Sequence, residues 1–196
     1  MKLVICEGGD ALGKNSLIRG LCEHYNYDNV AIRHFGKPPK GMSKPETLAF
    51  QFQCFNQEAD LYKQIKEVSN TKYKYYEDIV IWNRGPLGEF VYGQMFRKVE
   101  ASILKSLLDY YEKFTLNCLN DNDIYLITLI ADPEFFLSKE DGHSFSKNLE
   151  EKTKELSLFL EAHNFSLIKN KKIIKVNNNE KFRSKEEILQ EVLLFL

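Results

Sequence analysis

The sequence has no strong excess of charge of either sign and no long apolar run. It contains 27 Lys and Arg residues against 28 Asp and Glu residues, which gives a formal net charge of −1. No strong electrostatic field would therefore draw the whole molecule to nucleic acid or to an anionic membrane. No apolar stretch approaches the roughly 20 residues that a membrane span needs. These absences argue against a membrane protein and make a nucleic-acid partner the weaker expectation.

Cysteine is also scarce, with Cys6, Cys22, Cys54 and Cys118 scattered along the chain. Their spacing matches neither a metal site nor the dense disulfide framework of a small secreted protein. The first apolar run, Lys2 to Glu7, is too short for the core of a signal peptide and is interrupted by a charge at once. We therefore expect reduced thiols in a soluble, cytoplasmic protein.

What the sequence does contain is a series of five short apolar runs separated by segments with helical periodicity or turn residues. Continuous apolar runs are typical of strands buried on both faces, and this alternation predicts a parallel sheet covered by helices. A chain of 196 residues with 43% hydrophobic content suits one α/β domain with one sizeable core. The expected strands are Lys2–Cys6, Val30–Phe35, Asp78–Trp82, Ile124–Ala131 and Lys172–Val176.

Five intervening segments place apolar residues at helical spacing. Between the last two strands, Ser138–Ser146 is polar, charged and contains Gly142, which predicts a mobile lid at about residues 138–147. Asn177–Asn179 follows the fifth strand and forms either a strand-to-helix turn or a contact with a base. The expected helices are Leu17–Tyr25, Pro45–Ser69, Ile103–Leu119, Asn148–His163 and Lys185–Leu196.

A glycine-rich loop, Gly8–Ser16, lies between the first expected strand and the first expected helix and fits the pattern G-x-x-x-x-G-K. Its glycines allow a tight turn in which successive N–H groups face an anion, and the helix adds its positive N-terminus. Lys14 would reach the outer phosphates as a point charge. The pattern predicts a site for ATP phosphates rather than a turn without a ligand. The predicted ATP contacts are Gly8, Gly9, Ala11, Leu12, Gly13, Lys14, Asn15 and Ser16.

The loop departs from its usual pattern at the metal ligand. A Ser or Thr normally follows the lysine and binds Mg²⁺, whereas this sequence has Asn15 there and Ser16 one residue later. Both residues are candidate ligands. Glu7 and Asp10 place two acids beside a site for polyanions, an unfavourable arrangement without a metal or hydroxyl partner. Asp10 is therefore predicted either to accept a hydrogen bond from the sugar of an acceptor or to stabilise the turn.

Arginines follow two of the other strands. Arg84 lies at the carboxyl end of a central strand, where open α/β sheets bind ligands, and Arg33 ends the second run. A kinase that acts on a monophosphate needs cations there to bring two anions together, whereas a nucleoside kinase needs a carboxylate to accept a proton. Arg33, with Lys37 as a second cation, favours a monophosphate acceptor.

These motifs resemble the thymidylate kinase-like nucleotide kinases, most of all the phage-type deoxynucleoside monophosphate kinases. The segment Glu7–Lys14 is similar to the family's E-G-x-D-x-x-G-K loop, Asn83-Arg84 stands where the family has D-R, and Leu87–Gly93 resembles the helix that follows. Asp141-Gly142 matches the lid. The resemblance implies a three-layer P-loop NTPase fold with a five-stranded parallel sheet and a short lid. It also implies a single nucleotide kinase domain over residues 1–196.

The resemblance implies ATP- and Mg²⁺-dependent phosphorylation of a deoxynucleoside monophosphate, dTMP or a related pyrimidine nucleotide, to the diphosphate. Lys14, Arg84 and Asp10 would be the catalytic residues. Gln51 or Gln53 would read the base. The alternation of aromatic and polar residues in this segment is also typical of core residues alternating with surface residues. Tyr92 would close over the sugar or pack in the core, and Arg97 would bind phosphate or be a solvated helix-end residue. The implied acceptor contacts are Asp10, Arg33, Gln53, Arg84, Tyr92 and Arg97.

Three other functions remain open from the sequence. A deoxynucleoside kinase shares the same motifs, and a polynucleotide 5′-kinase would need a local basic groove. A catalytically inactive P-loop nucleotide-binding protein is suggested by Asn15 and Asn83, which both replace residues linked to Mg²⁺. The resemblance also leaves a homodimer open, and it places the protein in the host cytoplasm if its source is a virus.

Overall fold

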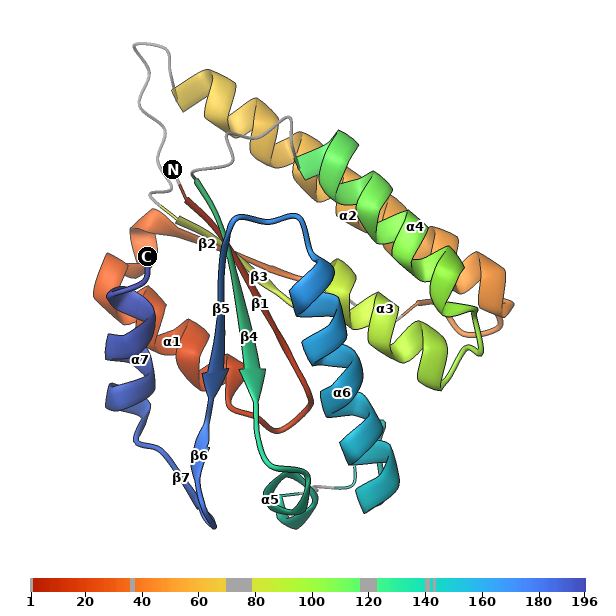
Figure 1. Cartoon of the computed structure of the whole chain (residues 1–196). Helices are drawn as coiled ribbons and strands as arrows, with labels where there is room; N and C mark the ends of the chain where they lie inside the picture. Colours follow the sequence, from red (N-terminus) through yellow and green to blue (C-terminus); the bar gives the residue numbers. More distant parts are fainter. Residues whose placement is uncertain (1, 36–37, 70–78, 117–122, 140–141, 143) are drawn as a thin grey trace.

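The computed structural model describes residues 2–35, 38–69, 79–116, 123–139, 142 and 144–196. Its centre is a five-stranded parallel sheet in the order β2-β3-β1-β4-β5, seen nearly edge-on in Figure 1. Each of the five strands begins and ends within two residues of the run that predicted it. The strands are β1 (Lys2–Gly8), β2 (Val30–His34), β3 (Ile79–Asn83), β4 (Ile124–Ile130) and β5 (Asn170–Lys175).

The central strand β1 shows why the apolar runs are continuous. Leu3 and Ile5 belong to one core cluster, and Val4 and Cys6 belong to another. Because successive side chains of a strand point to opposite faces, both faces of the sheet must be covered by helices. The expected α/β fold with three layers is therefore confirmed.

The helices divide between the two faces. Figure 1 shows α1 and α7 on one face, and α3 and α6 on the other with α2 and α4 outside them. The α-helices are α1 (Lys14–Tyr25), α2 (Lys44–Ser69), α3 (Pro86–Met95), α4 (Ala101–Tyr111), α5 (Pro133–Ser138), α6 (Leu149–Phe165) and α7 (Lys185–Leu193). Two short helices are η1 (Tyr27–Asn29) and η2 (Glu112–Leu116), the first 3-10 and the second π in type.

Two local features differ from the sequence-based expectation. Pro133 does more than end a strand, because it begins α5 at a position where its missing N–H is harmless. Asn177–Asn179 does not form a simple strand-to-helix turn. Instead Asn177–Asn178 (β6) pairs with Lys181–Phe182 (β7) in a short antiparallel hairpin. Some residues used in the sequence analysis lie outside the described residues: Lys37, Asp78, 117–119 and Asp141.

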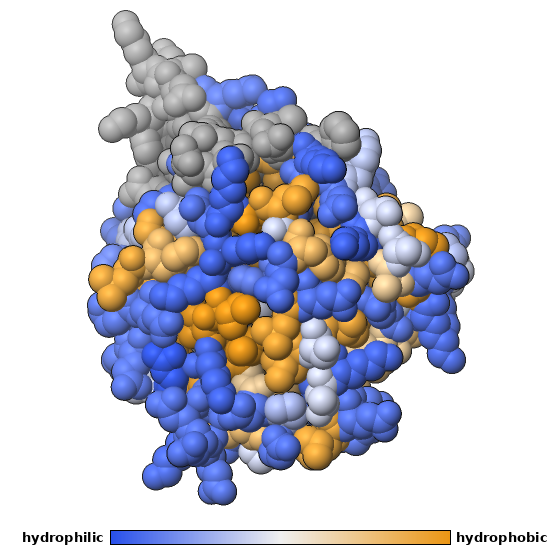
Figure 2. All heavy atoms as spheres, in the orientation of Figure 1, coloured by the Kyte–Doolittle hydropathy of each residue, from blue (hydrophilic) through white to orange (hydrophobic). Residues whose placement is uncertain are grey.

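The face of the molecule in Figure 2 is mostly hydrophilic, with apolar atoms exposed in separate patches. Within the described ranges, no helix is both long and apolar enough to cross a membrane.

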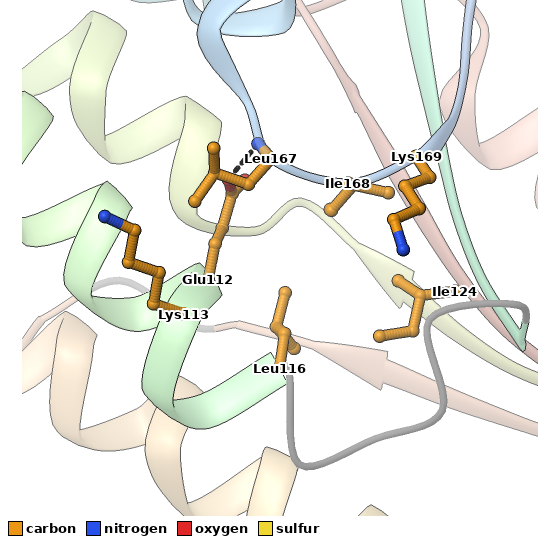
Figure 3. A pocket seen from close by; sticks show the side chains of 7 residues that line it. All are labelled: Glu112, Lys113, Leu116, Ile124, Leu167, Ile168 and Lys169. Carbon is orange, nitrogen blue, oxygen red and sulfur yellow. Dashed lines mark hydrogen bonds between the residues drawn. The ribbon is translucent and has the colours of Figure 1, made fainter.

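A small cavity of about 100 Å³ lies at the amino end of β4. Figure 3 shows the Glu112 side chain reaching the backbone of Leu167 there. This carboxylate also accepts a hydrogen bond from Ser166 Oγ at 2.7 Å, and burial raises its pKa. Glu112 thus joins η2 to the segment that follows α6, at the opposite end of the sheet from the glycine-rich loop. The lining residues are Glu112, Lys113, Leu116, Ile124, Leu167, Ile168 and Lys169.

Candidate active site

The glycine-rich loop turns between β1 and α1 through backbone conformations that favour glycine. Gly8 has φ 125° and Gly13 has φ 86°, and a Cβ on Gly8 would overlap the carbonyl oxygen of Leu129. Gly13 is the N-cap of α1 and has no side chain to cap the helix. The first amides of α1 therefore have no side-chain cap, which is the arrangement that the predicted phosphate site requires.

Lys14 is buried under this loop. Its Nζ donates hydrogen bonds to the carbonyl oxygens of Gly8 at 2.8 Å and Gly9 at 2.6 Å. Burial, with help from the nearby charge of Arg84, lowers the pKa of Lys14 to about 8. The side chain is thus still mainly protonated at pH 7 and is held beside the loop by carbonyl groups.

A cavity of about 320 Å³ lies over the loop and the carboxyl ends of β2 and β3. A second cavity, of about 360 Å³, shares His34 and Arg84 with it. A third, of about 420 Å³, adjoins it on the other side and shares Ala11, Gly13 and Ser16. After the roles that the sequence predicts, we call these the phosphate cavity, the acceptor-side cavity and the donor-side cavity. They form a continuous row at the carboxyl ends of the strands.

Arg84 stands between the phosphate cavity and the acceptor-side cavity. It has φ 79°, a strained conformation for a residue with a Cβ that costs on the order of 1 kcal/mol. Its backbone N–H donates to Cys6 O at 2.9 Å, and its guanidinium pairs with the Asp10 carboxylate. Burial alone would lower the pKa of Arg84, but Asp10 and Tyr92 raise it. The backbone thus holds a permanent cation at the junction.

The two departures from the family motifs contact each other. Asn83 Nδ2 donates to Asn15 Oδ1 at 2.8 Å, and both residues line the phosphate cavity. Asn83 is buried, and its Oδ1 has no hydrogen-bond partner. The two residues are far apart in the sequence, so only the fold reveals that the replacements form a pair.

The acceptor-side cavity corrects the choice of glutamine. Gln51 of α2 is buried and lines the cavity beside Phe55, whereas Gln53 is exposed and does not line it. Side chains two positions apart on a helix project about 200° apart around its axis. Gln53 therefore faces away from the cavity that Gln51 enters.

Arg33 is likewise not brought to the site. Its Nε pairs with Glu58 of α2 at 2.9 Å, and it lines neither the phosphate cavity nor the acceptor-side cavity. Side chains alternate along a strand, so Arg33 and His34 point to opposite faces of the sheet. The residue at the end of β2 that lines both cavities is His34.

Arg97 and Tyr92 do lie in the acceptor-side cavity. Arg97 pairs with Glu89 through both guanidinium nitrogens and is mostly buried, so it is not a solvated helix-end residue. The Tyr92 hydroxyl donates to Glu155 at 2.7 Å, and its ring lies 5.9 Å from the Arg84 guanidinium. Tyr92 therefore both packs in the core and lines the cavity, which are the two roles that the sequence left as alternatives.

The segment expected to form a lid contributes an aromatic residue that sequence reasoning missed. Phe145 lines the acceptor-side cavity. Its ring packs against Tyr92 at 5.1 Å and against Phe96 at 5.4 Å between centroids. The spacing in the sequence gives no signal for this contact, because the segment is short and irregular.

The lysines near this segment differ in position. Lys139 lies over the Phe135 ring, and Lys147 Nζ donates to Gly142 O at 2.8 Å. Lys152 of α6 is fully buried, with Nζ 3.6 Å from the centroid of the Phe136 ring. A Cβ on Gly9 would overlap that same ring. Lys152 is therefore a buried cation close behind the loop, although a lysine on a helix normally indicates a solvated face.

Glu7 is the buried acid of the loop, and it accepts a hydrogen bond from Gly88 N at 3.2 Å. Burial raises its pKa to about 7 from 4.5. The folded state therefore holds a proton that the unfolded state releases, so this group makes stability fall as pH rises from about 4.5 to 7.

We expect Glu7→Gln to remove this part of the pH dependence and to increase the free energy of unfolding, relative to wild type, by on the order of 1–3 kcal/mol at the upper end of the range. Urea unfolding of both proteins between pH 5 and 7 measures the difference. Parallel pH profiles for the two proteins would contradict the assignment. Glu58→Gln, which changes a half-buried surface acid, is the control.

A parallel sheet in this order, with a glycine-rich loop leading from β1 into the N-terminus of α1, is the P-loop NTPase fold. The same fold is found in three solved structures, two of which are thymidylate kinases. The YorR protein of Bacillus subtilis, in complex with phosphorylated GDP, aligns with a TM-score of 0.64 at 17% identity over 98% of this chain and 94% of its own. The expected likeness is thus confirmed at the level of the fold.

The thymidylate kinase of Ehrlichia chaffeensis aligns with a TM-score of 0.62 at 15% identity, over 98% of this chain and 97% of its own. The thymidylate kinase of Candida albicans aligns with a TM-score of 0.60 at 13% identity, over 98% and 89%. No protein-family model and no curated protein matches the sequence.

Proposed function

We propose that this chain is an ATP-dependent nucleoside monophosphate kinase. The observation that carries the proposal is the position of Arg84, which lines both the phosphate cavity and the acceptor-side cavity. A cation shared by two adjoining cavities suits a reaction that brings two phosphate groups together. The solved structures with the same fold include two thymidylate kinases, which supports a nucleotide as the acceptor.

The acceptor that suits the cavity best is a pyrimidine deoxynucleoside monophosphate such as dTMP. Arg84 and Arg97 supply cations for its phosphate. The Gln51 amide can donate and accept together, which matches the edge of a pyrimidine. Phe55 and Tyr92 offer aromatic surface for the base and the sugar. Asp10, now paired with Arg84, would accept from the sugar hydroxyl once a phosphate competes for that arginine.

The proposed reaction is an in-line transfer of the γ-phosphoryl group of ATP to a phosphate oxygen of the acceptor. The bond between that phosphorus and the bridging oxygen of ADP breaks as the new P–O bond forms, so no covalent enzyme intermediate is needed. Lys14, the amides of the loop and Arg84 would stabilise the charge on the transferred group. Catalysis then depends on positioning and on electrostatics.

Magnesium would neutralise part of the charge on the ATP phosphates when it is bound. The residues beside the phosphate cavity that suit it are Ser16, Asn15 and Asn83, which all offer oxygen ligands of the kind that Mg²⁺ prefers. None of these three carries a charge. The nucleotide phosphates would therefore supply most of the negative charge around the ion.

A single kinase domain over residues 1–196, with a lid at about 138–147, remains part of the proposal. Phe145 supports it, because it extends this segment to the acceptor-side cavity. Lys139 and Lys147 come from the same segment and Lys152 lies close behind the loop, and these three lysines are candidates for the charge that related kinases take from a lid arginine.

A deoxynucleoside kinase is the second candidate, and Glu89 favours it. This carboxylate lines the acceptor-side cavity and could accept the proton of a sugar hydroxyl, although it is paired with Arg97. An inactive nucleotide-binding protein is the third, on account of the Asn15–Asn83 pair.

The test is an ADP-release assay with ATP, Mg²⁺ and each common nucleoside and deoxynucleoside monophosphate, together with the matching nucleosides. We expect turnover with a pyrimidine deoxynucleoside monophosphate. We also expect Gln51→Ala to raise KM for that acceptor about tenfold or more, because the amide loses its base contacts, while the matched variant Gln53→Ala changes little. Turnover with nucleosides alone would favour the second candidate, and tight ATP binding without turnover would favour the third.

A further inference from the structure

The donor-side cavity adjoins the phosphate cavity and lacks Arg84, which the proposed function places toward the acceptor, so under that function it would hold the base of the phosphoryl donor. Its wall is mainly apolar. Leu12 and Leu17 form the side toward the loop and α1, and Phe182 and Ile188 form the side toward β7 and α7. The cavity opens into the phosphate cavity at Gly13 and Ser16. A purine joined to phosphates on the loop would therefore lie between these apolar groups.

The outer wall is the β6–β7 hairpin, which Figure 1 shows at the same end of the sheet as the carboxyl ends of β4 and β5. Asn177 fixes its base, because its Nδ2 donates to Asp132 at 2.9 Å and to Asn179 O at 2.7 Å. Phe182 packs edge-to-face on Phe135, with ring centroids 4.8 Å apart. The residue still has 44% of its surface exposed, so a positioned aromatic ring is available to a ligand.

Two polar residues of this wall are already used within the protein. Arg183 Nη1 donates to Lys175 O at 3.0 Å and pairs with Glu191 at 2.9 Å. Ser184 caps α7, and its Oγ accepts from Glu187 N at 3.1 Å while its own N–H donates to the Glu187 carboxylate. The wall therefore offers side-chain donors but few acceptors, because Arg183 only donates and the Ser184 oxygen already accepts a hydrogen bond.

Adenine carries an amino group at the ring position where guanine carries a carbonyl, and guanine has a further N–H. Among the described residues that line the cavity, none is Asp, Glu, Asn or Gln, so no side-chain amide or carboxylate meets these groups. Lys185 offers an exposed ammonium group. Its protons suit the N7 acceptor, which both purines carry.

We propose that the donor site accepts purine nucleotides without selecting between adenine and guanine, and that Phe182 supplies the main contact with the base. Apolar and stacking contacts depend on the area of the ring, which is nearly the same for the two purines. Strong selection requires buried hydrogen-bonding groups that the wrong base leaves unpaired. This inference rests on the proposed function, since that function assigns the cavity to the donor.

The test measures the equilibrium binding of ADP, GDP and UDP to the full chain by isothermal titration calorimetry. We expect Kd values for ADP and GDP within about tenfold of each other and weaker binding of UDP, which has the smaller ring. A preference above about 100-fold for either purine would overturn the inference while leaving the proposed function intact. Failure of all three to bind would overturn both. Equal binding of ADP and GDP without turnover in any assay would support the inference and contradict the proposed function.

The variant Phe182→Ala tests whether Phe182 supplies the main contact with the base. We expect it to weaken ADP and GDP binding by the same factor, about tenfold or more, and Phe182→Trp to keep both affinities. Tyr27→Ala is the matched control, because Tyr27 is an exposed aromatic residue that does not line the cavity. Unchanged affinity in Phe182→Ala, or a loss for one purine alone, would contradict the assignment.

Discussion

Lys14→Ala is expected to lower kcat/KM for phosphoryl transfer by about 10²- to 10³-fold or more, the effect of removing a preorganised charge from a phosphoryl-transfer site. The Lys14 ammonium lies beneath the loop, bonded to Gly8 O and Gly9 O. Under the proposed function it is the cation that the loop itself would supply to the phosphates. Initial rates with ATP and the best acceptor measure the loss.

The fold should survive this change. Burial disfavours the charged form of Lys14, as its lowered pKa indicates. Removing the side chain therefore removes this desolvation cost together with its two hydrogen bonds. We expect an unchanged circular dichroism spectrum and a thermal midpoint near that of wild type. Retention of near-full activity in a folded Lys14→Ala protein would contradict the role of the loop as a phosphate site.

Arg84→Ala is expected to have an effect of similar or larger size, about 10³-fold in kcat, as for arginines that stabilise the transferring phosphoryl group. Arg84 is the only arginine among the described residues that lines both the phosphate cavity and the acceptor-side cavity. Its φ of 79° is equally strained for alanine, so the substitution leaves the backbone preference unchanged. Arg84→Lys keeps a charge but loses the planar fork, and we expect it to recover only part of the activity.

Arg33→Ala is the matched control for this prediction. Arg33 lies near the carboxyl end of β2 and Arg84 follows the neighbouring parallel strand β3, but Arg33 pairs with Glu58 and lines neither cavity. We expect its kcat and KM to stay within a fewfold of wild type. Equal losses in the two variants would show that the arginines act together, and a mild effect of Arg84→Ala alone would contradict the shared-cation mechanism.

The fold could be predicted in considerable detail because its signals are local. β1 is apolar at every residue from Leu3 to Cys6 since it is buried on both faces. The α2 boundaries differ from the expected Pro45–Ser69 by one residue. The hairpin β6–β7 was missed because its strands are too short to carry a pattern.

The site was harder to predict, because adjacent residues in a strand or helix face different ways. Arg33 and Gln53 have suitable chemistry, but His34 and Gln51 are the residues that line the cavities. The sequence named Gln51 only as an alternative to Gln53 and did not assign His34 to the site. Phe145 was missed because nothing in an irregular segment indicates where its side chain packs.

The sequence by itself determined the five strands, most of the helices between them and the glycine-rich turn Gly8–Ser16 that leads into α1. Each of these depends on residues close together in the chain, such as apolar runs or glycines that allow positive φ. Only the tertiary structure decided that Asn83 donates a hydrogen bond to Asn15, that Arg84 lines two adjoining cavities, and that Phe182 lines a third. These relations depend on strand order and on the face that each side chain takes, which parallel strands fix only when the sheet assembles.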